Sequence, residues 1–274
     1  MKSIRRTAAV LAAAMTLGGC ADEAQIKTAA EMYEEAQVFE GIADYAAAVT
    51  AYNELQATYP HGNYAQQAIL NLAHLHYQEG KYDEALAAIN QFIEEYPAHR
   101  HLDYARYLRG LVLLREKPDV IDKLLFEDFT NHSRTAAVEA YEAFLELAEK
   151  HPLSRFTPSA AAKAADIINA LSLDELRTAL HYLRIGAYSG ALRRASDVTQ
   201  KYPSNRYNEI ALAIIVASLA EIQSPAPLQD AVAALEANFP DTTLSAPAQQ
   251  GALALLDSLG EETVRGDLFT QLLE

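Results

Sequence analysis

Histidine is the residue type of this 274-residue sequence that comes closest to a catalytic or metal-binding pattern. His74 and His76 lie two apart in a segment with helical periodicity, and such positions point to different helix faces, so the pair is a poor chelate. His99 and His101 flank Arg100, whose positive charge disfavours a metal ion. No glycine-rich phosphate loop, nucleophile elbow or helical metalloprotease motif accompanies them. The sequence therefore predicts no enzyme activity, no metal site and no bound cofactor.

The single cysteine, Cys20, offers a different chemistry, the attachment of lipid. It follows a basic start and an apolar run over residues 8–17, which is too short for a transmembrane helix of roughly 20 apolar residues. Residues 17–20 read LGGC and are similar to the lipobox of bacterial lipoproteins. That similarity implies a signal peptide over residues 1–19 and a covalent lipid on Cys20, namely an N-acyl chain such as palmitate and an S-diacylglycerol. The alternative is ordinary signal cleavage beside an incidental cysteine.

Lipid on Cys20 would attach the protein to a membrane without spanning it. One acyl chain binds a bilayer only marginally, at about 0.8 kcal/mol per buried methylene, so three chains would give a durable anchor. Lipoproteins that stay in the inner membrane often carry aspartate directly after the cysteine, whereas Ala21 follows here. The resemblance therefore implies the periplasmic face of the outer membrane, with residues 20–30 as a short lipidated linker.

The charge of the chain restricts its partners. Removal of residues 1–19 takes away three basic side chains and no acidic one, so the formal net charge falls from -15 to -18. A chain this acidic is repelled by nucleic acid and by anionic lipid, and we expect basic or neutral protein partners. The absence of a second cysteine excludes an internal disulfide, so the hydrophobic core has to stabilise the exported chain alone.

A repeated helix determines the expected fold. Three tyrosines are each followed by an alanine three residues later and by a proline fifteen residues later, and the apolar residues between them recur with the period of an α-helix. Proline ends each helix because it lacks an N–H group and disfavours helical geometry in the preceding residue. The three copies are Tyr45–Ala48–Pro60, Tyr82–Ala85–Pro97 and Tyr188–Ala191–Pro203.

A second helical pattern lies between the first two prolines, for example over residues 65–77, so the repeating unit is a helical hairpin. The 37-residue spacing of the first two copies and the terminal prolines resemble the tetratricopeptide repeat. Such hairpins must stack to bury their apolar stripes, which creates a concave surface. We therefore predict an all-α, tetratricopeptide-like solenoid of about five repeats. Three N-terminal repeats are expected over residues 31–157, C-terminal repeats over 158–222 and additional C-terminal helices over 223–274.

The third unit departs from the repeat pattern. An insert at residues 116–134 carries Pro118, Phe126 and Phe129, and long insertions in repeat proteins often serve binding. The insert could equally fill a gap in the core. Tyrosines offer the same two interpretations: Tyr64, Tyr104 and Tyr107 fall where a tetratricopeptide solenoid lines its groove, but core packing is the commoner role of such residues.

Two segments are specific beyond the general repeat pattern. Residues 59–67 read YPHGNYAQQ, and residues 103–111 read DYARYLRGL. Both runs resemble the BamD family, the tetratricopeptide lipoproteins of the machinery that assembles β-barrels in the bacterial outer membrane. The resemblance extends from Cys20 to about Ile222, and the chain departs from the family pattern after Ser224.

The resemblance implies a scaffold whose N-terminal half receives unfolded β-barrel precursors by their C-terminal signal, and whose C-terminal half docks the barrel subunit of the machinery. It also implies contacts with the smaller lipoproteins of that machinery. The substrate-binding residues that it implies are Tyr64, Gln67, Tyr104, Tyr107 and Arg109. The family position that faces the barrel subunit corresponds to Arg194, beside Arg193, although both arginines could instead lie on a solvated face. The alternative function is a periplasmic adaptor for envelope or peptidoglycan machinery.

Overall fold

The computed structural model describes residues 27–114 and 131–263, which fold into α-helices without a β-strand in these two ranges. None of the described helices is long and apolar enough to cross a membrane. The predicted all-α fold is therefore confirmed. The helices are α1 (Ala29–Gly41), α2 (Tyr45–Thr58), α3 (Asn63–Gln78), α4 (Tyr82–Glu95), α5 (Leu102–Leu113), α6 (Asn131–Lys150), α7 (Thr157–Arg184), α8 (Tyr188–Lys201), α9 (Asn208–Ile222), α10 (Pro225–Asn238), α11 (Ser245–Gln249) and α12 (Ala252–Thr263).

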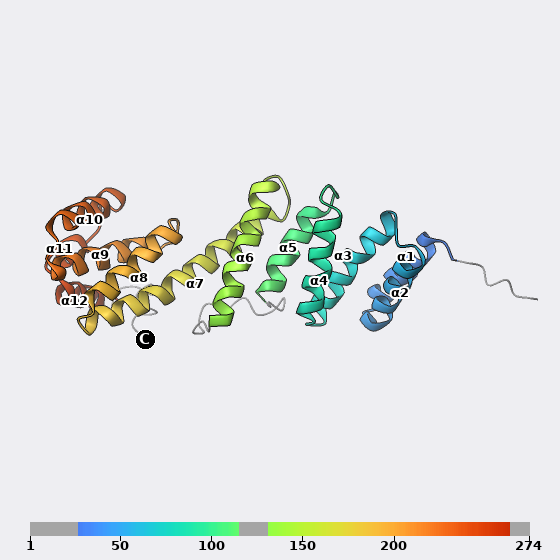
Figure 1. Cartoon of the computed structure of the whole chain (residues 1–274), viewed down its shortest axis with the longest axis horizontal. Helices are drawn as coiled ribbons and strands as arrows, with labels where there is room; N and C mark the ends of the chain where they lie inside the picture. Colours follow the sequence, from blue (N-terminus) through green and yellow to red (C-terminus); the bar gives the residue numbers. More distant parts are fainter. Residues whose placement is uncertain (1–26, 115–130, 264–274) are drawn as a thin grey trace, which may run out of the picture.

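Consecutive helices pack as hairpins, which follow one another in a row along the longest axis of the molecule (Figure 1). The described residues contain five hairpins, α1/α2, α3/α4, α5/α6, α7/α8 and α9/α10. The two remaining helices pack at the C-terminal end, where α11 contacts α9 and α12 contacts both α7 and α9. This arrangement confirms the predicted helical-hairpin solenoid with about five repeats.

Proline ends the repeat helices as the sequence predicts. Tyr59, Tyr96 and Tyr202 follow the last residues of α2, α4 and α8 and precede a proline in each case. All three have φ between -127° and -130° and ψ between 57° and 75°, a non-helical geometry, as expected because a following proline disfavours the α region. Each helix therefore ends at the same point of its repeat, and the chain turns into the next hairpin.

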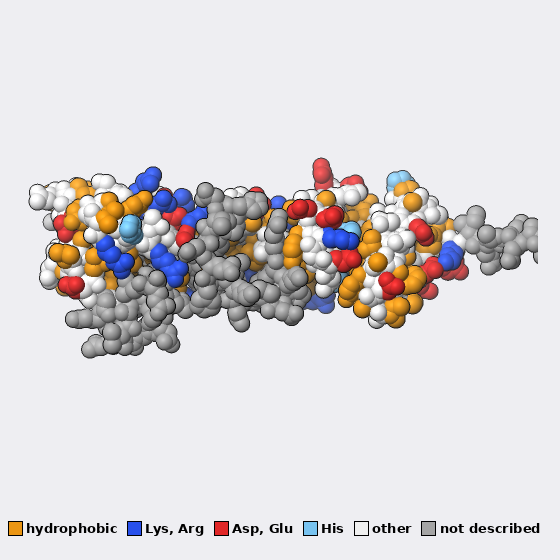
Figure 2. Space-filling view, turned by 90° about the horizontal axis from the view of Figure 1, so that it is seen from below, with side chains coloured by type: hydrophobic (Ala, Val, Ile, Leu, Met, Phe, Trp, Pro, Cys, Tyr) orange, Lys and Arg blue, Asp and Glu red, His pale blue; other side chains and the backbone are white. Residues whose placement is uncertain are grey.

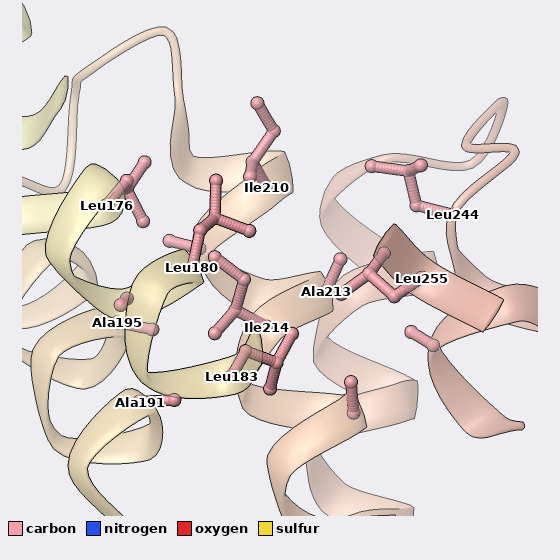
Figure 3. Close-up of a cluster of buried hydrophobic side chains, with 14 of the residues drawn as sticks. Leu176, Leu180, Leu183, Ala191, Ala195, Ile210, Ala213, Ile214, Leu244 and Leu255 are labelled. Atoms are coloured by element: carbon pink, nitrogen blue, oxygen red, sulfur yellow. The ribbon is translucent and has the colours of Figure 1, made fainter. Parts of the chain in front are cut away.

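Small residues allow the helices to approach one another. Ala48, Ala85 and Ala191, the alanines of the three repeat copies, are completely buried. Larger side chains fill the space around them, and the biggest cluster joins α7, α8, α9 and the C-terminal helices (Figure 3). In that cluster Leu180 and Leu183 of α7 lie against Ile214 of α9. The core is thus continuous from one hairpin to the next, as in other repeat proteins.

Two departures from the sequence prediction concern the third unit and the C-terminus. Helix α6 begins at Asn131, within the insert expected over residues 116–134, while Pro118, Phe126 and Phe129 of the insert lie outside the described residues. Near the C-terminus, Gly251 at φ +110° separates α11 from α12. Within the segment expected to hold additional helices, α10 packs on α9 as the second half of a fifth hairpin.

Gly110 is the closest crossing point between α5 and α6. A Cβ atom added there would come within 2.6 Å of Cζ of the fully buried Phe144 ring, which has no free space into which to move. We expect Gly110→Ala to lower the free energy of unfolding by about 1–3 kcal/mol through overpacking. Urea unfolding followed by circular dichroism measures this change.

Gly41→Ala is the matched control, because a Cβ at Gly41 meets nothing within 4 Å. In the helical context of α1 this substitution should be neutral or stabilising by up to about 1 kcal/mol. Equal unfolding curves for the two variants would show that the α5–α6 crossing tolerates a side chain, which would contradict the close packing of Gly110 against Phe144.

Candidate functional site

A cavity of about 830 Å³ opens between α1, the start of α3 and the connection between α4 and α5. It lies at the junction of the first two hairpins, where the proline-ended connections turn the chain back. Its lining combines aromatic rings, side-chain amides and cationic or ionisable groups, and it includes Tyr33, Tyr64, Gln67, Tyr96, Arg100 and His101. Two residues that the family resemblance implies for substrate binding, Tyr64 and Gln67, thus share one cavity.

Hydrogen bonds hold the polar wall of the cavity in place. The Gln67 side-chain amide donates to Asn71 Oδ1 at 3.1 Å, and Asn71 Nδ2 donates to the hydroxyls of Tyr33 at 3.1 Å and Tyr52 at 2.7 Å. The Tyr52 hydroxyl in turn donates to a carboxylate oxygen of Glu40 at 3.0 Å. Burial raises the pKa of Tyr33 and of Tyr52, so both hydroxyls keep their protons at neutral pH. This chain of hydrogen bonds connects the Gln67 side chain through Asn71 to the buried Tyr52 and so fixes its position.

Aromatic rings form the apolar wall of the same cavity. The ring centroids of Tyr33 and Tyr64 are 5.4 Å apart, and those of Tyr33 and Tyr52 are 5.6 Å apart. Tyr52 is fully buried, whereas the side of the cavity at Tyr64 is open, with 43% of that residue exposed. The buried Tyr52 ring thus packs against Tyr33, and Tyr33 packs against Tyr64, whose ring a ligand can reach.

The positive side of the cavity comes from Arg100 and from the start of α3. Arg100 is exposed, in a stretch over residues 27–114 that carries twelve acidic and only five basic side chains. Gly62 precedes α3 at φ +107° and supplies no side-chain cap, so the first-turn N–H groups of α3 are not satisfied by a capping side chain. Both features favour a negatively charged group at this end of the cavity.

The structure separates Tyr104 and Tyr107 from Tyr64 and Gln67. Both tyrosines lie on α5 and surround Phe156, at ring-centroid distances of 5.3 and 5.1 Å. The Tyr104 hydroxyl hydrogen-bonds to His74 Nδ1 at 2.8 Å, and burial raises the pKa of Tyr104 to about 12 while it lowers the pKa of His74. These side chains line a second junction, between the second and third hairpins.

Neither Tyr107 nor Arg109 lines the cavity. The Tyr107 hydroxyl hydrogen-bonds to Ser159 Oγ at 2.8 Å, which ties α5 to α7. Arg109 is half-buried on α5, and its Nε atom has no hydrogen-bond partner among the described residues. The five implied substrate residues therefore belong to more than one junction of the solenoid.

The arginines predicted to bind the barrel subunit differ from each other in their surroundings. Arg193 is exposed on α8 and forms no ion pair with the residues that the structure describes. The Nη1 group of Arg194 donates to Glu175 Oε2 at 2.9 Å, and this hydrogen bond is the main cause that raises the pKa of Arg194. Arg194 is thus held within the protein, while Arg193 faces solvent.

Charge along the solenoid is strongly segmented. Residues 150–210 contain nine basic and five acidic side chains, whereas residues 211–263 contain seven acidic ones and no Lys or Arg. Figure 2 shows Lys and Arg side chains gathered over the α7–α9 part of the molecule. The basic side chains are thus concentrated in the α7–α9 part of an acidic protein, and Arg193, which is exposed on α8, belongs to that part of the sequence.

Comparison with known proteins identifies the family. The family model YfiO, described as outer membrane lipoprotein, matches residues 25–235. The chain belongs to this family. It is 35% identical over 246 residues to the outer membrane protein assembly factor BamD of Neisseria meningitidis serogroup B, covering 88% of this chain and 92% of that protein. It is 28% identical over 240 residues to BamD of Xylella fastidiosa strain 9a5c, covering 85% and 82% of the two chains.

Solved structures with tetratricopeptide repeats also align with this chain. The TPR2AB-domain:pHSP90 complex of yeast Sti1 aligns with a TM-score of 0.36 and 14% identity over 85% of this chain and 86% of that chain. The TPR domain of P58(IPK) aligns with a TM-score of 0.39 and 14% identity over 89% and 63%. The family assignment rests on the sequence relatives.

The family match extends further toward the C-terminus than the sequence resemblance predicted, and it does not include Cys20. The resemblance to the BamD family was expected to end near Ile222, but the matched region continues to residue 235, through most of α10. The lipidation candidate Cys20 precedes both the matched region and the described residues. The sequence patterns did not single out Tyr33 or Arg100, because α1 lacks the family runs and Arg100 lies in a connection between helices.

Proposed function

We propose that this protein is a scaffold subunit of the machinery that assembles β-barrel proteins in the outer membrane. The observation that carries the proposal is the near full-length similarity to proteins named outer membrane protein assembly factor BamD, at 35% identity over 88% of this chain. The described architecture suits such a role, since stacked hairpins provide one extended surface with separate binding regions. Two of these regions differ in shape and charge, and we assign a different partner to each.

We propose that the protein acts by binding rather than by catalysis. The cavity presents aromatic rings, side-chain amides and an arginine, which can recognise a ligand, together with the Glu95 carboxylate. His99 accepts a hydrogen bond from the backbone N–H of His101 at 3.2 Å and packs edge-on against Phe92, so it has a structural role. Burial lowers the pKa of His99, which favours its neutral form.

The cavity fits the C-terminal segment of an unfolded β-barrel precursor that ends in an aromatic residue. Such a segment offers an aromatic ring for the wall at Tyr33 and Tyr64 and a terminal carboxylate for Arg100. Side-chain amides such as Gln67 can pair with its backbone groups. Tyr104, Tyr107 and Arg109 would meet a longer segment that continues toward the third hairpin.

The cavity assignment predicts which changes weaken substrate binding. Tyr64→Ala and Arg100→Gln should each weaken the binding of a synthetic peptide that ends in phenylalanine with a free carboxylate, by about tenfold. Fluorescence anisotropy with the full-length protein measures the dissociation constant. Arg193→Gln, which removes a positive charge far from the cavity, is the matched control and should leave the affinity unchanged.

A second peptide with an amidated C-terminus separates the two contacts. The amidated peptide should bind the unmodified protein as weakly as the free-acid peptide binds the Arg100→Gln variant, because each combination lacks one partner of the ion pair between Arg100 and the terminal carboxylate. Equal affinity of both peptides for the unmodified protein would contradict the role assigned to Arg100.

The basic surface over α7 and α8 fits a partner that presents carboxylates. We propose that the periplasmic part of the barrel subunit docks here and contacts Arg193, with Arg194 beside it. Charge complementarity accelerates and orients such an association, and truncation of a close charged contact weakens it. The acidic C-terminal part, α9 to α12, remains for the smaller lipoproteins of the machinery.

Charge reversal tests the docking face. Arg193→Glu and Arg194→Glu should each release the barrel subunit in a pull-down from detergent-solubilised outer membrane, because a carboxylate would then meet the carboxylates of the partner. Arg100→Glu, in the connection between α4 and α5, is the matched control away from the docking face and should retain the barrel subunit. The circular dichroism of all three variants should remain helical, and retention of the barrel subunit by both docking variants would place the interface elsewhere.

The proposed membrane anchor is the lipid on Cys20, at the periplasmic face of the outer membrane. The Tyr59 hydroxyl donates to the carbonyl of Lys27 at 2.8 Å, which fixes the beginning of the described chain against the first hairpin. Six residues separate Cys20 from Lys27, so the two Cα atoms lie at most about 25 Å apart. The first hairpin, and with it the cavity, would therefore lie close to the membrane surface.

Lipidation predicts a clear difference for one substitution. The protein should incorporate radioactive palmitate in growing cells, whereas Cys20→Ser should incorporate none and should appear in the periplasmic fraction after cell fractionation. A Cys20→Ser protein that stays with the outer membrane in the absence of label, even when the barrel subunit is depleted, would show that the lipid is not the anchor.

A further inference from the structure

Glu175 of α7 lies between arginines from the two neighbouring helices. Its Oε1 atom accepts from Arg134 of α6 at 2.9 Å, and its Oε2 atom accepts from Arg194 of α8 at 2.9 Å. Asp174 accepts from the other terminal nitrogen of Arg134. Among the ion pairs of the described residues, Glu175 is the only carboxylate that joins arginines from two other helices.

The burial of these groups distinguishes the cluster from an ordinary surface ion pair. Only 13% of the Glu175 side chain is exposed, against 29% for Arg134 and 32% for Arg194. Two positive and two negative side chains, with Asp174 included, balance one another in this partly dry environment. Loss of the Glu175 charge alone would leave Arg134 and Arg194 as neighbouring cations, and such uncompensated charge is costly where solvent screens it poorly.

The cluster also lies at a specific place in the solenoid. Helix α6 completes the third hairpin and α8 is the second helix of the fourth, so Glu175 links the half assigned to substrate with the half assigned to docking. Arg193 immediately precedes Arg194 on α8 and points about 100° away around the helix axis. The bond to Glu175 therefore fixes the side chain of Arg194, while Arg193 leaves the helix in a different direction.

We propose that Glu175 is the positioning residue of the docking face: by holding Arg134 of α6 and Arg194 of α8 at once, it orients Arg194 toward an acidic partner. This inference rests on the proposed docking of the barrel subunit. It assigns different roles to adjacent arginines. Arg193 contacts the partner from the solvent side, while the partly exposed Arg194 is held in position beside it by Glu175.

The proposal is tested by the affinity of the full-length protein for the purified barrel subunit in detergent. Glu175→Gln keeps the size of the side chain and removes its charge, and it should weaken binding by about tenfold, the typical effect of losing a charge-assisted hydrogen bond. Asp166→Asn removes an exposed charge from the same helix and should have no effect. Glu175→Asp retains the charge and should recover part of the affinity.

A double-mutant cycle separates positioning from general destabilisation. If Glu175 acts through Arg194, then Glu175→Gln combined with Arg194→Gln should bind no more weakly than Arg194→Gln alone. Glu175→Gln combined with Arg193→Gln should instead multiply the two single losses, to about a hundredfold. If Glu175→Gln instead weakened binding by destabilising the fold, its loss of affinity would multiply with the loss caused by either arginine substitution. The melting temperature of the variant would then also fall.

The possible failures are distinguishable. Unchanged binding of both Arg193→Gln and Arg194→Gln would overturn the proposed docking face itself. Weakened binding of the arginine variants together with full affinity of Glu175→Gln would overturn the positioning role of Glu175 and leave the docking face intact. The positioning role would likewise be contradicted if the Glu175→Gln, Arg194→Gln double variant lost affinity by the product of the two single losses.

Discussion

Each helical hairpin in this protein carries an apolar stripe that only a neighbouring hairpin can bury. That constraint determines the architecture. Fully buried alanines such as Ala48, Ala85 and Ala191 let helices cross closely, and a proline after each repeat helix returns the chain to the next crossing. The hydrophobic clusters consequently run from one hairpin into the next, up to the C-terminal helices that close the row.

The functional regions follow from the same constraint, because both lie at junctions between hairpins. The cavity forms where the start of α3 and the α4–α5 connection meet α1, and a chain of hydrogen bonds through Asn71 ties its wall to the core. The Glu175 cluster lies where α6, α7 and α8 pack together. Stacking supplies the geometry at both places. Arg100 suits the cavity to a carboxyl-terminated peptide, and the basic segment over residues 150–210 suits the second region to an acidic protein surface.

Sequence alone predicted the fold well, since the tyrosine, alanine and proline spacing states both where a helix ends and which face it buries. The same spacing did not predict which residues of different hairpins lie next to one another. Tyr64 and Gln67 came from a family run and line the cavity, but Tyr33 and Arg100 join them only through the stacking of two hairpins. Similarly, the sequence placed Arg193 and Arg194 side by side, while the carboxylate that distinguishes them is nineteen residues from Arg194 on another helix.

Depletion of the protein would test whether this scaffold serves the assembly of outer-membrane β-barrels. Quantitative proteomics of the outer-membrane fraction, with parallel labelling of the cell wall, would follow the consequences over several generations. We expect β-barrel proteins to decline together in the outer membrane as the protein disappears, before cell-wall labelling changes. Normal β-barrel levels alongside altered cell-wall labelling would contradict it and would favour an adaptor for envelope or peptidoglycan machinery.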